Sequence, residues 1–306
     1  MKKKILAVSV LNALFAFSAC PSFAEEKLTP FQPGASTGVP IATLPPPNVY
    51  LTFESNIHGG PLRNYDGSRS AIKTYTIANG ARLLVVPGWN FLNAKFAAAI
   101  TQIYEVGNTH NNITGQDQHS DGLFNTFINP EILSWKLTKN NYFSESVAIY
   151  LPNGSYDHSG SKTTAASFAN NYTTFEPSMF YSYVGNGWNF SLANYYDFNT
   201  KNQATEYRSG QAYYLDWTIA HHYGNFEFGL IGNYTQQITP DTQFGKEVAN
   251  VGGHGYGNKY MYTSVGPMLD YKLGKTTISL RYLQNISGRN GVTPSFFHIA
   301  FSLPLS

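Results

Sequence analysis

Most side chains that could do chemistry in this sequence lie in segments where polar and apolar residues alternate. One set shares the polar face of such segments: Asp216, His222, Glu227, Asn233, Asp270 and Arg281. Tight turns at Gly224-Asn225 and Gly274-Lys275 place His222 opposite Glu227 and Asp270 diagonal to Arg281. Opposite charges on one face either line an aqueous path and tune its selectivity, or form structural pairs across a filled interior. The pattern favours structural pairs and leaves a role in selectivity open.

Catalytic and metal-binding patterns are weak in the rest of the chain. Glu206 and Arg208, in the stretch TEYRSG, are expected to form a local ion pair that fixes a loop, in preference to binding a polar ligand group. HSDG (119–122) and DHSG (157–160) bring His close to Ser and Asp, as a hydrolase requires, but no GxSxG motif accompanies them. The Gly-rich stretch 251–260 lacks the GK[ST] of a phosphate loop, and no HxxxH or cysteine pattern suggests a metal site. We therefore predict no enzyme, no cofactor and no metal ion.

The N-terminal residues predict an exported protein. Three lysines, an apolar run over 5–17 and the sequence Ser22-Phe23-Ala24 match a signal peptide over residues 1–24. Lipid attachment at Cys20 is a weaker alternative, because the flanking Phe17 and Pro21 fit it poorly. Cys20 is the only cysteine, so the mature chain is expected to form no disulfide. Loss of the three lysines lowers the formal charge from +2 to −1, which argues against nucleic acid as a partner.

The composition is unusual for a protein surrounded by water. Charged residues make up 12% of the chain and aromatic residues 15%, whereas ordinary soluble domains carry about 25% charged residues. No apolar run after the signal reaches the roughly 20 residues that a membrane helix needs. These features predict an antiparallel transmembrane β-barrel in the cell outer membrane of a Gram-negative bacterium, with the lipid bilayer and the barrel-assembly machinery as partners. A secreted soluble β-protein is the alternative.

The stretch MFYSYVGNGWNFSLANYYDF, residues 179–198, illustrates the strand pattern. Asn186-Gly187 is a strong signal for a two-residue hairpin turn, because both turn residues must adopt positive φ. A turn there places Tyr183 opposite Phe190 on an apolar face, and Ser182 opposite Ser191 on a polar face. In a barrel the first face meets lipid and the second meets the lumen.

Extending this pattern predicts about twelve strands. Their expected ranges are 48–56, 80–87, 90–105, 123–137, 142–152, 172–185, 188–199, 207–223, 226–238, 259–273, 276–286 and 294–304. Short turns near 88, 139, 186, 224 and 274 alternate with long connections, so all short turns are expected at the end that bears both termini, in the periplasm. Pro267, in the middle of a strand, is expected to require a bulge.

The domain organisation follows directly. Residues 1–24 form the signal peptide, residues 25–47 an irregular leader rich in Pro and Gly, and residues 48–306 the barrel. The leader begins at the barrel mouth. It either folds into the lumen as a plug or remains a free periplasmic tail.

Several stretches resemble a known family. NTKNQATEYRSG, the hairpin VGPMLDYKLGKTTISLRY and LPPPNVYLTF are similar to segments of the MetA-pathway phenol-degradation family of outer-membrane transporters. The resemblance extends over about residues 40–305 and implies a channel for small hydrophobic molecules, without implying catalytic residues. One departure is the C-terminus, which ends in Ser306 where many barrels end in Phe.

These observations predict a channel or transporter for the passive diffusion of small hydrophobic, aromatic solutes. The predicted inner face mixes small residues with aromatic ones, which suits such a solute better than an ion. A structural or adhesive barrel with exposed loops is the second hypothesis, and an outer-membrane lipid hydrolase is the third.

Overall fold

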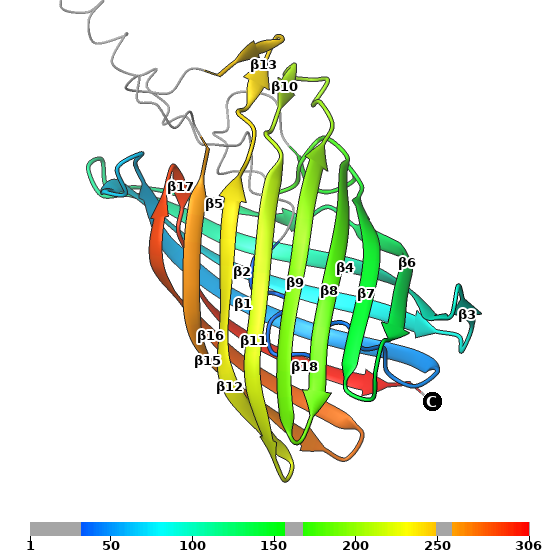
Figure 1. Ribbon diagram of the computed structural model, residues 1–306. Helices are drawn as coiled ribbons and strands as arrows, with labels where there is room; N and C mark the ends of the chain where they lie inside the picture. The colour runs from blue at the N-terminus through cyan, green and yellow to red at the C-terminus, as the bar shows by residue number, and fades with distance from the viewer. Residues whose placement is uncertain (1–31, 157–167, 249–258, 306) are drawn as a thin grey trace, which may run out of the picture.

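The computed structural model describes residues 32–156, 168–248 and 259–305, so the signal peptide and the DHSG stretch lie outside the described residues. Twelve long strands run antiparallel to their neighbours. They are β1 (Asn48–Arg63), β2 (Arg69–Val86), β4 (Ala94–Asn111), β6 (Phe127–Lys136), β7 (Asn141–Tyr150), β8 (Thr174–Gly185), β9 (Trp188–Asn199), β11 (Ala212–Tyr223), β12 (Phe226–Gln237), β15 (Met261–Leu273), β16 (Thr276–Arg289) and β18 (Ser295–Pro304). β1 pairs with both β2 and β18, which closes the sheet into a barrel (Figure 1). The predicted fold class is confirmed.

The described residues also form six short strands in addition to the twelve long ones. They are β3 (Asn90–Phe91), β5 (Gln116–Leu123), β10 (Tyr207–Arg208), β13 (Thr242–Gln243), β14 (Lys246–Glu247) and β17 (Gly291–Val292). β10, β13 and β14 form a small separate sheet beyond the barrel rim, at the end opposite the C-terminus (Figure 1). None of the described residues belongs to a helix long and apolar enough to cross a membrane.

The hairpin turns follow from local sequence. Asn186 and Gly187 have φ of 55° and 79°, as a type I′ turn requires, and Tyr183 pairs with Phe190 as predicted. The predicted pairing of His222 with Glu227 is also confirmed. The first turn differs from its prediction. It falls at Leu92 and Asn93, both with positive φ, and not at Pro87-Gly88, because β3 continues the strand direction past the proline.

Pro267 does not produce the expected bulge. Val265 pairs with Gln284 and Met268 with Arg281, so the register of β15 on β16 is the same on both sides of the proline. Pro267 keeps its place opposite Leu230 on the other side, and the ladder to β16 is simply interrupted for two residues. A proline lacks the N–H for one ladder bond, and here the sheet gives up that bond without inserting a residue. The register shift of β15 lies at Thr263 and Ser264 instead.

The connections at the two barrel ends differ less in length than predicted. The segments 57–79 and 106–122, expected as long loops, are mostly strand: β1 runs to Arg63, β2 begins at Arg69, and β4 pairs with β5. The turns that remain, 64–68 and 112–115, are short and lie at the end opposite the C-terminus. The prediction that every short turn lies at the end bearing the termini is therefore wrong. The strands extend because alternation continues beyond the length that a membrane needs. We call the end with the C-terminus the turn end, and the opposite end the loop end.

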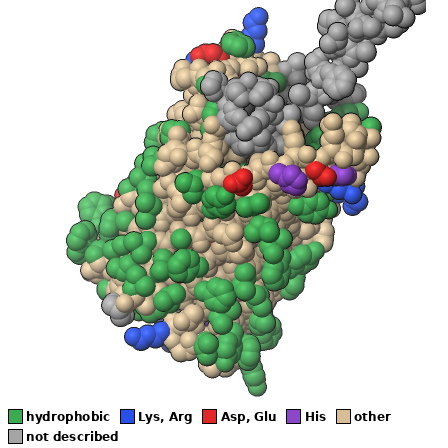
Figure 2. All heavy atoms as spheres, turned by 180° about the vertical axis from the view of Figure 1, so that it is seen from behind, with side chains coloured by type: hydrophobic (Ala, Val, Ile, Leu, Met, Phe, Trp, Pro, Cys, Tyr) green, Lys and Arg blue, Asp and Glu red, His purple; other side chains and the backbone are tan. Residues whose placement is uncertain are grey.

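The outer surface of the barrel is apolar. Phe228, Leu230 and Phe301 expose 52%, 55% and 41% of their surface, while the nearby inward residues Glu227, Ile231 and Ala300 are buried. Figure 2 shows hydrophobic side chains spread over the barrel wall, with coloured charged groups mostly near its two ends. At the turn end Trp89, Trp188, Tyr223 and Phe226 are exposed, as expected of an aromatic girdle.

Candidate functional site

The barrel encloses a cavity of about 820 Å³, which we call the lumen cavity. Its lining extends from Lys272 and Lys275 at the turn end to Asn290 and Gly291 at the loop end. The lining therefore reaches both ends of the barrel. Small residues and aromatic residues both line the cavity, together with a limited number of charged groups. Such a space suits a small organic solute, because ligand sites are mostly apolar with a few placed polar groups.

Residues 32–47 of the leader lie inside the barrel. Asp216 accepts hydrogen bonds from the Gly34 and Ser36 amides at 2.8 and 3.2 Å and from the Ser36 hydroxyl at 2.7 Å. Closer to the turn end, the Ala42 amide donates to Ser182 Oγ at 3.0 Å and the Ala42 carbonyl accepts from Ser134. The inner wall formed by β6, β8 and β11 thus binds the leader through several partners that are distant in sequence.

Two glycines make this close docking possible. Gly34 and Gly38 have φ of 89° and 77°, a region that other residues rarely adopt. A Cβ at Gly34 would lie 2.4 Å from Leu283 Cδ1, and one at Gly38 would lie 2.5 Å from Arg281 Nε. The leader backbone can therefore approach β16 only because both positions lack a side chain.

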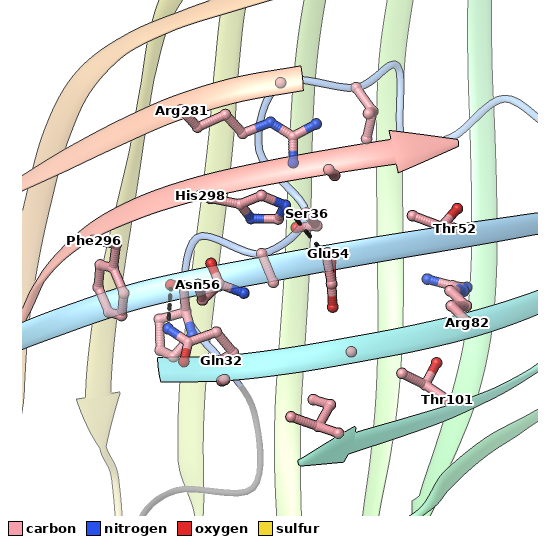
Figure 3. Close-up of a pocket in the computed structure, with 18 of the residues that line it drawn as sticks. Gln32, Ser36, Thr52, Glu54, Asn56, Arg82, Thr101, Arg281, Phe296 and His298 are labelled. Carbon is pink, nitrogen blue, oxygen red and sulfur yellow. Dashed lines mark hydrogen bonds and ion pairs between the residues drawn. The ribbon is translucent and has the colours of Figure 1, made fainter. Parts of the chain in front are cut away.

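The opposite side of the cavity carries a cluster of charged residues. Glu54 Oε2 lies 3.7 Å from His298 Nε2, and Arg82 and Arg281 both act on the Glu54 carboxylate electrostatically. Figure 3 shows these side chains projecting from β1, β2, β16 and β18 into the space beside the leader residue Ser36. The Nε atoms of Arg82 and Arg281 are buried without a hydrogen-bond partner. This wall therefore contains buried polar atoms whose hydrogen-bonding capacity is not used within the described residues.

The structure brings some of the predicted site residues together. His222 Nε2 lies 3.1 Å from Glu227 Oε2, near the turn end, and Asn189 also donates to Glu227 at 3.1 Å. Asn233 is fully buried and donates to Thr235 at 3.3 Å.

The remaining lumen candidates do not pair. Asp270 lies opposite Ser279, and Arg281 lies opposite Met268. Both side chains are buried and line the cavity, but they form no ion pair with one another in the described structure. The sign of each charge was evident from the sequence, but the side-chain distance was not.

The loop candidates form no ion pair with each other. Glu206 pairs with Lys201 Nζ at 2.6 Å, and both side chains are largely exposed. Arg208 Nε donates to the carbonyl of Asn199 at 3.0 Å. Each residue fixes its own part of the loop next to β10, and neither faces the lumen cavity.

Sequence analysis missed a group of buried acids near the loop end. Glu176 accepts from Tyr150 at 3.3 and 3.4 Å, and Asp197 accepts from Tyr214 at 2.9 Å. Glu105 also lines the cavity. Each lies on the inward phase of its strand, so continued alternation is the signal that could have found them. Glu105 was missed because its strand was expected to end there.

The comparisons with known proteins define the family. A family model described as "Putative MetA-pathway of phenol degradation" matches residues 61–300. The chain belongs to this family. The resemblance inferred from the sequence is thereby confirmed, and it covers most of the barrel. No protein with a curated function matches the sequence.

Three solved structures of outer-membrane proteins are similar to this chain to different degrees. An outer membrane channel from Pseudomonas putida F1 is similar, with a TM-score of 0.70 and 12% identity over 85% of this chain and 96% of that one. The translocator domain of the autotransporter NalP from Neisseria meningitidis has a TM-score of 0.48, with 9% identity over 84% and 88% of the two chains. The TodX monoaromatic hydrocarbon channel has a TM-score of 0.42, with 10% identity over 87% and 92%. The first similarity shows that this chain has the fold of an outer-membrane barrel.

The HSDG stretch does not assemble a hydrolase site. It lies within β5, where successive side chains point to opposite faces. Ser120 is buried and lines the lumen cavity, whereas His119 and Asp121 are exposed. Asp121 instead accepts a hydrogen bond from the Tyr104 hydroxyl at 2.6 Å. No group of three or more potential metal ligands occurs among the described residues.

Proposed function

We propose that this protein is a non-catalytic outer-membrane channel through which small hydrophobic, aromatic solutes diffuse passively. The observation that carries the proposal is the lumen cavity, whose lining reaches both barrel ends and combines small residues with aromatic ones. Membership of a family named for phenol degradation supports an aromatic solute. The similar protein from Pseudomonas putida is itself described as an outer membrane channel.

The strand number supports a passage. An eight-stranded barrel is just wide enough for its side chains to fill, and diameter grows with the number of strands. Twelve strands leave additional room, part of which the leader occupies. The charged groups of the lining have both signs, so the lining lacks the ring of one charge that selects simple ions. We expect the barrel-assembly machinery to insert the protein into the membrane.

The leader has the position of a gate in this proposal. Residues 32–47 occupy the lumen and are bound by hydrogen bonds that solute transfer does not require. Release of the leader widens the path without any change in the barrel wall. Solute flux would then depend on how often the leader leaves Asp216.

Reconstituted vesicles provide the test. The full mature protein and a variant lacking residues 26–44 are compared for entry of toluene and of a polar sugar of similar size. We expect the full protein to pass toluene faster than empty vesicles, and the deletion to pass it faster still. A melting transition by circular dichroism verifies that the deletion keeps its barrel. If neither protein passes any hydrophobic solute faster than empty vesicles, the channel proposal fails.

A further inference from the structure

Glu105 differs from most of the inward-facing acids. It lies in the loop-end half of β4, is 7% exposed and lines the lumen cavity. Its Oε2 atom is buried with no hydrogen-bond partner, and no described residue forms an ion pair with it. Glu176, Asp197, Asp216 and Glu227 by contrast all accept hydrogen bonds from neighbouring side chains or backbone. An unpaired buried carboxylate is costly, so its presence in a cavity indicates a function.

The strand neighbours of Glu105 lie against a buried aromatic cluster. Phe124, Tyr150 and Phe168 form one buried cluster, against which Ile103 and Phe127 pack. On β4, Ile103 and Gly107 are the inward neighbours of Glu105 on either side. The Phe168 ring lies so close to Gly107 that a Cβ there would be 2.6 Å from its Cζ atom. Glu105 therefore lies between two residues that contact the aromatic cluster, and we call this region the aromatic chamber.

The charge of the lining changes along the barrel. The lysines and arginines that line the cavity are Arg82, Arg281, Lys272 and Lys275, and all belong to the turn-end half of their strands or to a turn. In the loop-end half the lining acids are Glu105 and Glu176, with no lining lysine or arginine among the described residues. The aromatic chamber is thus the acidic part of the cavity. It disfavours an anionic solute and stabilises a cationic one.

We propose that Glu105 and the aromatic chamber bind small aromatic solutes that carry a protonated amine. The inference rests on the proposed channel and names a solute class for it. The ammonium group pairs with the Glu105 carboxylate, and the faces of Phe124 and Phe168 stabilise the same charge by cation–π interaction. The solute ring packs on the remaining apolar lining, including Ile103. The Glu105 carboxylate thereby gains the partner that it lacks among the described residues.

A set of one-ring probes tests this site by equilibrium binding to the whole mature protein in detergent micelles. Benzylamine carries a cation at neutral pH, benzyl alcohol a neutral donor, toluene no polar group, and benzoate an anion. We expect benzylamine to bind about tenfold more tightly than benzyl alcohol, as a partly desolvated cation–π and ion-pair contact implies. Toluene should follow, and benzoate should bind most weakly.

Two variants separate the site from the general charge of the lumen. Glu105→Gln should abolish the preference for benzylamine over benzyl alcohol while leaving the affinity for toluene unchanged. Asp270→Asn removes the same charge from the turn-end half of the cavity, far from the aromatic chamber, and should retain the preference. Phe168→Leu keeps the carboxylate, and it should weaken the binding of benzylamine several-fold more than the binding of benzyl alcohol.

The outcomes distinguish the two proposals. Equal binding of the four probes, a preference that survives Glu105→Gln, or equal losses in Glu105→Gln and Asp270→Asn would each overturn the amine site. If Glu105→Gln does not fold, the Phe168→Leu variant decides the question in the same way. Binding that follows the expected order in a protein that passes no solute would support the amine site and overturn the channel.

Discussion

The two sides of the lumen differ in whether their polar groups have hydrogen-bond partners. On β8 and β11, Ser182, Asp216 and Thr218 all form hydrogen bonds with the leader. On β2 and β4, Arg82 and Glu105 keep buried atoms without a partner. We call the first the docked wall and the second, together with the adjacent β1, the open wall. A satisfied polar group holds structure together, whereas an unsatisfied one is retained at a cost that binding can offset.

The largest effect is expected on the docked wall, from Asp216→Ala. This change leaves the Gly34 amide and the Ser36 amide and hydroxyl without their acceptor. A hydrogen bond to a charged group contributes about 1.5–3 kcal/mol. Loss of three should therefore weaken leader docking by roughly 3 kcal/mol or more, about a hundredfold in the docked-to-free ratio. Limited proteolysis of the leader measures the change, with the barrel expected to remain resistant. An unchanged cleavage rate would mean that the docked wall does not hold the leader.

A second comparison lies within the open wall itself. Phe53 faces outward from β1 with 50% exposure, and Thr52 lines the cavity on the other face. About ten residues of a strand cross the membrane, so position 53 falls near its midplane. Phe53→Arg should lower the free energy of unfolding by about 2–4 kcal/mol, and Thr52→Arg by much less. Urea unfolding in lipid vesicles measures both. Equal costs would show that the open wall does not face water.

A smaller effect is expected from Ser182→Ala. The Ser182 hydroxyl accepts the Ala42 amide and is also paired with Ser191 at 2.8 Å. Its loss should weaken leader docking by about 1 kcal/mol, the usual net contribution of one neutral hydrogen bond. The same proteolysis assay applies, and the cleavage rate should rise less than for Asp216→Ala. A larger increase than for Asp216→Ala would reverse the assigned order of the two contacts.

The smallest effect on stability is expected from Glu105→Gln on the open wall. The change replaces a buried carboxyl group, whose Oε2 atom has no hydrogen-bond partner, with an amide of similar size, so the free energy of unfolding should stay within about 0.5 kcal/mol or rise. The measurement is the same urea titration, with Asp216→Ala as its counterpart on the docked wall. A loss of several kcal/mol would show that Glu105 has a structural partner, and the distinction between the walls would fail.

The sequence predicted the features that depend on neighbours along the chain. Asn186-Gly187 fixes its hairpin because only certain residues adopt positive φ, and the register then places every side chain between β8 and β9. Strand ends were less predictable, because alternation continues into the segments beyond the membrane. Glu105 was overlooked for that reason.

The leader contacts depend on residues that are distant in sequence. Asp216 and Gly34 are 182 positions apart, and no local pattern links them. The leader's lack of periodicity indicated only that it would not form a strand. Its partners are set by which inward side chains the closed barrel presents at each depth, a property of the whole sheet.

The seam of the barrel has a consequence for its biogenesis. Tyr50 pairs with Pro304 and Phe53 with Phe301, so the last contact to close joins the two ends of the strand sequence. Until β18 arrives, the partial sheet has two free edges whose backbone groups cannot be satisfied by lipid. A chain that lacks β18 is therefore expected to be less stable in a membrane than the closed barrel. The pairing of β1 with β18 thus makes closure of the barrel depend on the last of its twelve long strands.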